Sequence, residues 1–249
     1  MLDSLSIAMQ KYLYQDLYDL EETHWWHKVK RDLESFFLKK YLPDKNNKLL
    51  DVGCGAGKNI EAFSRLGECW GIDSSSDAIS FCKKRGITKA IKGSIEKIPF
   101  SKQSFNIITA LDVLEHVNDL KSLKEIYRVL KTNGVIIITV PAFPKLWSRW
   151  DEVLHHKRRY TKKSLERILQ ENSFRILKIS YVYSFLVLPV FLIRLIKQFF
   201  FKDYYPSDFK LSSPLVNSLL SFVCRFEKSF VTRATIPVGT SLIAIARKD

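Results

Sequence analysis

Residues 49–59 (L-L-D-V-G-C-G-A-G-K-N) join an apolar segment to a turn with three glycines, Gly53, Gly55 and Gly57, and Cys54 is a small residue between the first two. Glycine adopts positive φ freely and has no side chain, so such a turn lets a ligand lie against main-chain N–H groups at the start of the next helix. The segment therefore predicts a small-molecule pocket. Its G-x-G-x-G spacing differs from the G-x-G-x-x-G of dinucleotide sites, which favours a ligand other than NAD.

Acidic residues occur where further strands of an alternating strand–helix chain are expected to lie. Asp51 belongs to the apolar segment before the glycines. The strand-like segment 68–72 is followed by Asp73 and Ser74, and a later apolar segment ends at Asp112. A carboxylate at a strand tip can accept hydrogen bonds from both hydroxyls of a ribose. The order and spacing of these residues favour a ligand site at the carboxyl edge of a parallel sheet.

The complete set of motifs resembles the class I S-adenosylmethionine (AdoMet) methyltransferases. The segments that carry this likeness are L-L-D-V-G-C-G-A-G at 49–57, W-G-I-D-S-S at 70–75, G-S-I-E-K-I-P-F at 93–100 and L-D-V-L-E-H-V at 111–117. Two further motifs, H-W-W-H at 24–27 and D…H-x-R-R-Y-T at 151–161, are similar to members associated with glycan or lipid-glycan biosynthesis.

This resemblance implies a binding site for AdoMet. The residues that it assigns to the cofactor are Asp51, Gly53, Cys54, Gly55, Gly57, Asp73, Ser74, Ser94, Ile95 and Asp112. Asp73 would take the ribose, and Asp112 would border the methionine end. The family commonly has Asp where Ser94 stands, so we expect a weaker contact to the adenine, or one made by the backbone of Ile95.

The resemblance also implies the fold. It is α/β, with a Rossmann-like seven-stranded sheet that is mostly parallel and has an antiparallel last strand. We predict one methyltransferase domain over residues 1–249. Within it, residues 1–43 form an N-terminal helical lid, residues 48–183 and 238–247 form the core sheet, and residues 184–237 form a helical insertion between the last two strands.

Two histidines are candidate bases. The methyl group of a sulfonium is already activated, so the protein has to align an acceptor and remove the proton of a hydroxyl. We favour His156, in the loop after the fifth predicted strand, over His116, which follows the fourth. The motif around His116 is also similar to ubiquinone-biosynthesis O-methyltransferases, in which the acids and the histidine of that turn can bind a divalent cation. Asp112, Glu115 and His116 would then be ligands, but Asp112 replaces the usual Glu, and we predict no metal.

The segment W-D-E-V-L-H-H-K-R-R-Y-T at 150–161 is the candidate acceptor site. Two adjacent arginines suit a carboxylate or phosphate through bidentate pairing. The predicted acceptor-binding residues are Asp151, Arg158, Arg159 and Tyr160. The alternative is a solvated basic loop before a helix.

The predicted insertion is far longer than the turn that would join two strands. Residues 185–201 are apolar on nearly every side. Arg194, Lys197 and Lys202 lie at the edge of this run. A second predicted helix has one apolar face, formed by Leu215, Leu219, Phe222, Val223, Phe226 and Phe230. Apolar helices edged by cations are typical of elements that lie on anionic lipid. A cap on the sheet and a homodimer interface remain alternatives.

The composition of the chain bears on its partners and its cellular location. The net charge is +14, but the basic residues are scattered without interleaved aromatic residues, which disfavours nucleic acid as a partner. The four cysteines form no C-x-x-C pair, and no basic segment precedes an apolar core at the N-terminus. We therefore expect a cytoplasmic protein, with membrane association at the cytoplasmic face through the insertion.

Together these features predict AdoMet-dependent methyl transfer, most specifically O-methylation of a small-molecule, glycan or lipid-linked acceptor. Two alternatives stay open. One is an NAD-binding Rossmann oxidoreductase, and the other is a non-catalytic AdoMet-binding or scaffold protein.

Overall fold

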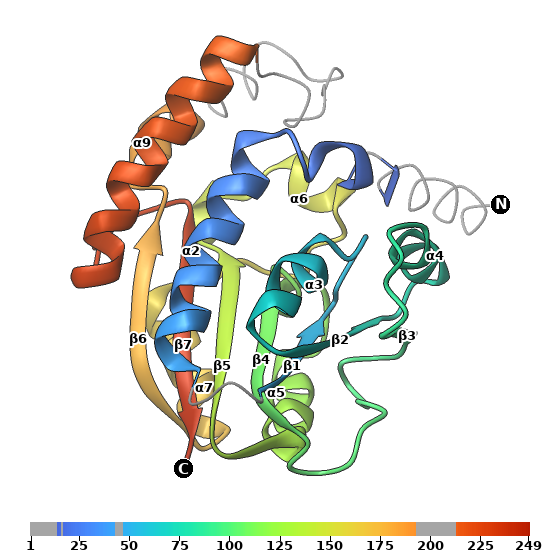
Figure 1. Ribbon diagram of the computed structural model, residues 1–249. Helices are drawn as coiled ribbons and strands as arrows, with labels where there is room; N and C mark the ends of the chain where they lie inside the picture. The colour runs from blue at the N-terminus through green and yellow to red at the C-terminus, as the bar shows by residue number, and fades with distance from the viewer. Residues whose placement is uncertain (1–13, 16, 43–46, 193–212) are drawn as a thin grey trace, which may run out of the picture.

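The computed structural model describes residues 14–15, 17–42, 47–192 and 213–249, and its centre is a seven-stranded sheet (Figure 1). The strand order is β3-β2-β1-β4-β5-β7-β6. The strands are β1 (Lys48–Val52), β2 (Glu68–Asp73), β3 (Ala90–Lys92), β4 (Phe105–Leu111), β5 (Leu130–Pro141), β6 (Phe174–Val182) and β7 (Ser241–Lys248). Strands β1 to β5 pair in parallel, whereas β7 runs antiparallel to both β5 and β6. The predicted α/β, Rossmann-like fold with its antiparallel last strand is confirmed.

Helices cover both faces of the sheet. The helices are α2 (Trp25–Tyr41), α3 (Lys58–Phe63), α4 (Ser76–Lys84), α5 (Asp119–Val129), α6 (Arg149–Val153), α7 (Lys162–Glu171) and α9 (Pro214–Arg233), with short 3-10 turns η1 (Ser64–Leu66), η2 (Leu114–His116), η3 (Pro144–Leu146) and η4 (Ser184–Leu186). One apolar core holds residues of α5 and α7, and a second holds residues of α2, α3, α4 and α9. The central strands face both cores, which explains why they read as continuous apolar runs.

Side-chain caps fix where several helices begin, and therefore where the loops at the carboxyl edge lie. Ser75 accepts from the N–H groups of Asp77 and Ala78 at the start of α4, and Asn118 accepts from that of Lys121 in α5. These bonds satisfy donors that have no partner within a helix. The strand-to-helix loops are thus held at the edge where open α/β sheets bind ligands.

Helix α2 crosses the front of the sheet in Figure 1 and packs through a stripe of apolar residues. Trp25, Val29, Leu33 and Phe37 are buried at spacings of one helical turn. His24 is the N-cap, and its ring accepts from the N–H of Trp26. The same packing turns the neighbouring polar residues of α2 toward the tips of the central strands.

In the predicted insertion, Ser213 caps α9 and Pro214 occupies its first turn. Residues 193–212, with Arg194, Lys197 and Lys202, lie outside the described residues. Within the ranges that the structure describes, none of the helices has the length and apolar character required to cross a membrane. The assignment of residues 1–249 to one domain with a lid and an insertion stays a prediction.

Candidate active site

The turn between β1 and α3 holds all three predicted glycines at positive φ, 70° at Gly53, 53° at Gly55 and 87° at Gly57. A Cβ atom on Gly53 would lie 2.4 Å from Cγ2 of Val113, so a side chain does not fit there. A Cβ atom on Gly55 would lie 3.1 Å from Cδ2 of Leu17, in the N-terminal segment. The main chain of the turn is therefore packed closely against that segment.

Asp73 lies at the tip of β2 beside the glycine turn, as predicted. Its Oδ2 accepts from the N–H of Gly55 (3.0 Å) and its Oδ1 from the N–H of Ser75 (2.9 Å). The Tyr14 hydroxyl is 3.5 Å from Oδ1. Burial raises the pKa of Asp73, although these hydrogen bonds oppose the shift. Ser74, the next residue, is exposed at the same edge.

Asp51 and Cys54 are buried, on either side of the first glycine of the turn. Oδ1 of Asp51 accepts from Oγ1 of Thr109 on β4 (2.6 Å), and its Oδ2 has no hydrogen-bond partner among the described residues. Burial raises the pKa of Asp51 to about 7. The structure therefore places these two predicted cofactor residues within the protein core.

The segment predicted to border an adenine follows β3. The N–H of Gly93 donates to the carbonyl oxygen of Asp73 (2.9 Å), which ties the segment to the tip of β2. Ser94 is exposed and its hydroxyl accepts from the N–H of Glu96 (3.1 Å), whereas the side chain of Ile95 is in the core. The Ser94 hydroxyl thus engages its own loop.

Asp112 at the tip of β4 is held from two sides. Oδ1 accepts from the hydroxyl of Thr139 (3.0 Å), and Oδ2 forms an ion pair with Nζ of Lys30 from α2. Although burial raises the pKa of Asp112, Lys30 holds it below its usual range. This ion pair fixes α2 over the central strands, and Lys30 is not among the residues predicted from the sequence.

Two more carboxylates lie near Lys30, and neither forms an ion pair within the described residues. Glu34 and Glu115 are buried, and Oε1 of Glu34 and both carboxylate oxygens of Glu115 have no hydrogen-bond partner in the described part of the chain. Burial raises the pKa of Glu34 to about 7 and that of Glu115 well above its usual value. Buried acceptors without partners are costly, so this region favours a ligand that brings donors or positive charge.

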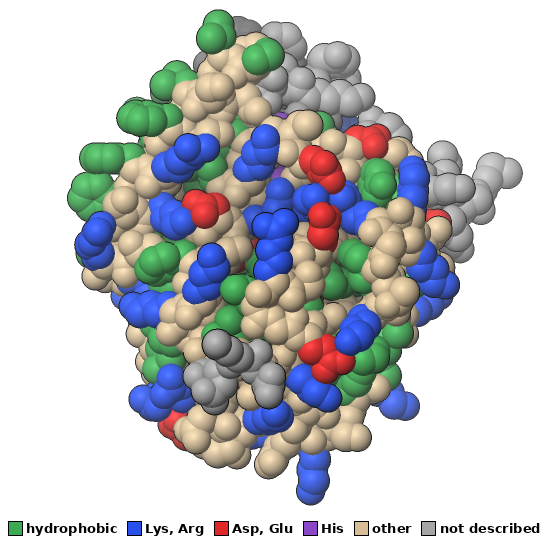
Figure 2. Space-filling view, in the orientation of Figure 1, with side chains coloured by type: hydrophobic (Ala, Val, Ile, Leu, Met, Phe, Trp, Pro, Cys, Tyr) green, Lys and Arg blue, Asp and Glu red, His purple; other side chains and the backbone are tan. Residues whose placement is uncertain are grey.

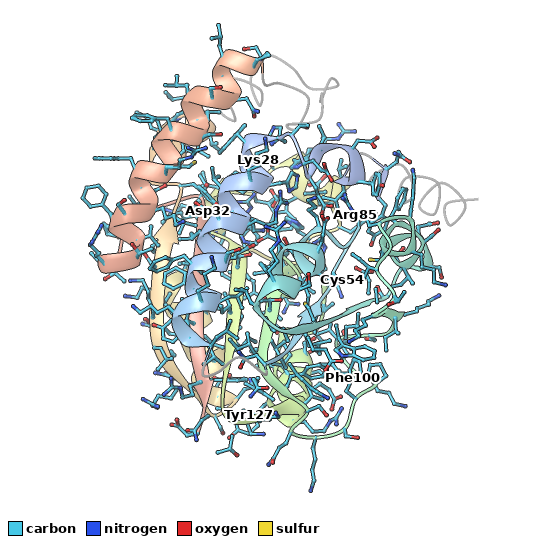
Figure 3. All side chains as sticks on the ribbon, in the orientation of Figure 1. Lys28, Asp32, Cys54, Arg85, Phe100 and Tyr127 are labelled. Carbon is cyan, nitrogen blue, oxygen red and sulfur yellow. The ribbon has the colours of Figure 1, made fainter. Side chains whose placement is uncertain are left out.

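A second missed residue, Arg85 (labelled in Figure 3), joins the glycine turn to the N-terminal segment. Its guanidinium donates to the carbonyl oxygens of Ala56 (2.9 Å) and Tyr18 (3.0 Å) and pairs with the carboxylate of Glu21 (3.1 Å). The side chain is nearly buried, so these bonds are shielded from solvent. Arg85 therefore holds the N-terminal segment against the glycine turn.

His156 is oriented by a buried carboxylate. Oδ1 of Asp151 lies 2.8 Å from Nδ1 of His156 and 2.7 Å from Nε of Arg159, and Oδ2 accepts from the N–H of Ser148 (2.8 Å). Although burial raises it, His156 and Arg159 hold the pKa of Asp151 far below its usual range. Because an ionised carboxylate only accepts, Nδ1 of His156 carries the hydrogen, and Nε2 is left as the basic atom.

The two predicted bases, His116 and His156, lie together, with ring centroids 4.8 Å apart. Burial lowers the pKa of His116 to about 4. Candidate ligand atoms of Glu115, His116 and His156 lie within 4.8 Å of one another. The alternative ligand set, which contained Asp112 in place of His156, is not the one assembled, because Asp112 is engaged by Lys30.

The other predicted acceptor contacts are used within the protein. Arg159 is bonded to Asp151 and to the carbonyl oxygen of Ala142 (3.0 Å). The hydroxyl of Tyr160, a buried residue, donates to Oδ2 of Asp119 (3.0 Å), which also pairs with Arg158 (2.7 Å). These bonds argue against direct contact of Arg159 and Tyr160 with an acceptor. The side chain of Arg158 is 35% exposed, and its contact with an acceptor stays a prediction.

The chain is similar in sequence to known methyltransferases. Residues 50–138 match the model of a methyltransferase domain. An uncharacterised methyltransferase of Bacillus subtilis is 33% identical over 124 residues, 45% of this chain and 47% of the relative. A ubiquinone biosynthesis O-methyltransferase of Pelagibacter ubique is 37% identical over 102 residues, 39% of this chain and 42% of the relative. The chain thus matches less than half the length of these curated relatives.

Solved structures agree on the fold. A SAM-dependent methyltransferase from Archaeoglobus fulgidus superposes with a TM-score of 0.57 at 21% identity, over 88% of this chain and 94% of that one. Residues 50–138 therefore match a methyltransferase domain, and the fold is shared with a SAM-dependent methyltransferase. The domain match and the shared fold support S-adenosylmethionine as the cofactor. The glycine turn, the carboxylate of Asp73, which is predicted to take the ribose, and the acceptors without partners at Glu34 and Glu115 fit a ligand with hydroxyls and positive charge.

Asp73→Ala should weaken AdoMet binding by about 1.5 to 3 kcal/mol, because it removes a charged acceptor of two hydroxyls. Gly55→Val should also weaken binding, because a side chain would enter the space beside the turn. Titration calorimetry measures both, with Asp77→Ala in the first turn of α4 as the matched control. Unchanged affinity of folded Asp73→Ala would refute the ribose assignment.

Glu34 should make stability depend on pH. Its folded pKa of about 7 lies above the usual glutamate value, so the stabilisation that it gives is complete below that usual value and is lost as the pH rises through about 7. Relative to the parent, Glu34→Gln should therefore gain about 2 to 3 kcal/mol in free energy of unfolding between about pH 5 and about pH 8.

Chemical denaturation at the two pH values tests this expectation. Glu152→Gln, at an exposed position, is the control. If the free energy of unfolding of Glu34→Gln changes with pH in parallel with that of the parent, the raised pKa of Glu34 is wrong.

Proposed function

We propose that the protein transfers the methyl group of AdoMet to a hydroxyl of a small-molecule, glycan or lipid-linked acceptor, with His156 as the base. The Asp151–His156 pair carries this proposal, because it leaves a basic nitrogen in the loop region over the carboxyl ends of the strands. The relative named for O-methylation in ubiquinone biosynthesis supports an oxygen acceptor. The match to a methyltransferase domain supports AdoMet over the NAD alternative.

The cofactor, when bound, supplies an activated methyl group. The chain has to orient the acceptor and take its proton. Nε2 of His156 accepts that proton, Asp151 stabilises the imidazolium through Nδ1, and Arg159 keeps Asp151 ionised. Lys30 and Asp112 hold α2 over the site, where it limits access of water.

His156→Ala should lower turnover by about 100- to 10,000-fold, the usual cost of losing a general base. Asp151→Asn should also lower turnover, because an amide can present its N–H to Nδ1 and favour the wrong tautomer. The measurement is release of S-adenosylhomocysteine in the presence of a membrane-lipid extract. His155→Ala, at the exposed neighbouring position, is the matched control. Normal turnover of His156→Ala would remove His156 as the base.

A metal-assisted reaction is the second candidate, favoured by the buried Glu115 beside His116 and His156. Two histidines and a carboxylate form a ligand set for divalent transition metals, and Asp151 would orient His156 from behind. In the base mechanism, treatment with a chelator leaves turnover unchanged. If chelation and His116→Ala each abolish turnover while His156→Ala does not, metal assistance replaces the base mechanism.

The cellular location of the protein is part of the same proposal. A cytoplasmic enzyme with a lipid-linked acceptor would work at the cytoplasmic face of a membrane, and an anionic surface suits a chain with a net charge of +14. A homodimer is the alternative use of the apolar surface of the insertion.

A further inference from the structure

Helix α9 presents a row of exposed apolar side chains. Those that are between 53% and 84% exposed are Leu215, Leu219, Phe222, Phe226 and Phe230, which we call the α9 stripe. Their spacing of three and four residues puts them on one side of the helix. In Figure 2 hydrophobic side chains gather along the upper left edge, where Figure 1 shows α9. Such a surface is typical of a contact with a partner.

The opposite side of α9 is fixed to the protein. Cys224 and Val231 are buried in the core that α9 shares with α2. The buried carboxylate of Glu227 accepts from the N–H groups of Tyr183 (2.9 Å) and Ser184 (2.7 Å). Because these contacts occupy the inner side, the helix cannot rotate to bury the stripe against the sheet.

The charges on α9 select among partners. Its only acidic residue, Glu227, is buried and bonded, whereas Arg225 and Arg233 are exposed. Two copies of this helix packed face to face would bring like charges together without an exposed acid of α9 to balance them. An anionic lipid surface accepts the apolar side chains and also attracts the cations. The observations therefore favour a membrane over a second copy.

Helix α9 is also clamped to the N-terminus of α2. Oδ1 of Asn217 accepts from the N–H of Trp25 (2.7 Å), and its Nδ2 donates to the carbonyl oxygen of Thr23 (2.9 Å). Lys228 pairs with Asp32 of α2 (2.7 Å), which is labelled in Figure 3. Since α2 also carries Lys30, the partner of Asp112, the two helices link the stripe to the strand tips.

We propose that the α9 stripe docks the protein onto an anionic membrane surface, and that the clamp at Asn217 makes this contact hold α2 over the methyl-transfer site. Docking itself does not depend on methyl transfer. The second part rests on the proposed function, because it concerns the helix that covers the proposed cofactor site.

Flotation with phosphatidylglycerol vesicles tests docking, with phosphatidylcholine vesicles for comparison. The parent should float with the anionic vesicles only, and added salt should release it. Phe222→Ser with Phe226→Ser should weaken binding by about 100-fold, because two large apolar side chains no longer enter the interface. Leu120→Ser, an exposed apolar site on α5, is the control and should bind as the parent does. Equal flotation of the folded double variant would overturn the proposal, as would a parent dimer that the double variant dissociates.

Amide hydrogen exchange in α2 tests the clamp. Anionic vesicles should slow exchange over residues 25–41 of the parent. Asn217→Ala should still float but lose this protection, and a parent that floats without protection would overturn the link to α2. Calorimetry with AdoMet on the same samples separates membrane docking from the proposed methyl transfer. Protein that floats but has no affinity for AdoMet would contradict the proposed function and leave the docking proposal intact.

Discussion

Compensation of buried negative charge is the constraint on which the arrangement of this protein depends. The carboxylates of Asp51, Glu34 and Glu115 are buried near the tips of the central strands, and Asp112 beside them is half-buried. Uncompensated burial of charge costs several kcal/mol, so such groups become protonated or acquire cationic partners. Lys30 interacts electrostatically with all four carboxylates, and its ion pair with Asp112 holds α2 against the strand tips. Helix α9 in turn packs on α2, so the outer surface follows from the charge balance of the interior.

The same constraint explains the loop that carries His156. Asp151 is fully buried, and its carboxylate is stabilised by Arg159, by His156 and by a backbone N–H. An aspartate that stays ionised in such a place fixes the imidazole in one tautomer. Arg159, whose type suits an acceptor, is therefore bonded to Asp151, the partner of the proposed base His156.

Features that lie within one strand-to-helix unit were predictable from the sequence. Contacts that depend on burial between distant segments were not. The glycine turn and Asp73 were predictable, because each lies in one strand-to-helix unit whose geometry places it at the carboxyl edge. Lys30 was not, because it meets Asp112 across 82 positions through the packing of α2. Its place four residues after Trp26, on the buried side of a helix, was the available signal. Arg159 and Tyr160 were assigned to an acceptor from their types, which reveal charge and polarity but not burial.

The central claim is that the methyl group of AdoMet moves to an oxygen of an acceptor. Incubation with AdoMet that carries a deuterated methyl group, in the presence of a lipid and glycan extract, followed by mass spectrometry, tests it most directly. The account predicts an extract component that gains one deuterated methyl group on oxygen, with an equal amount of S-adenosylhomocysteine. Labelled AdoMet that binds to the protein but remains intact with every fraction of the extract would contradict it, and would identify a protein that binds the cofactor without using it.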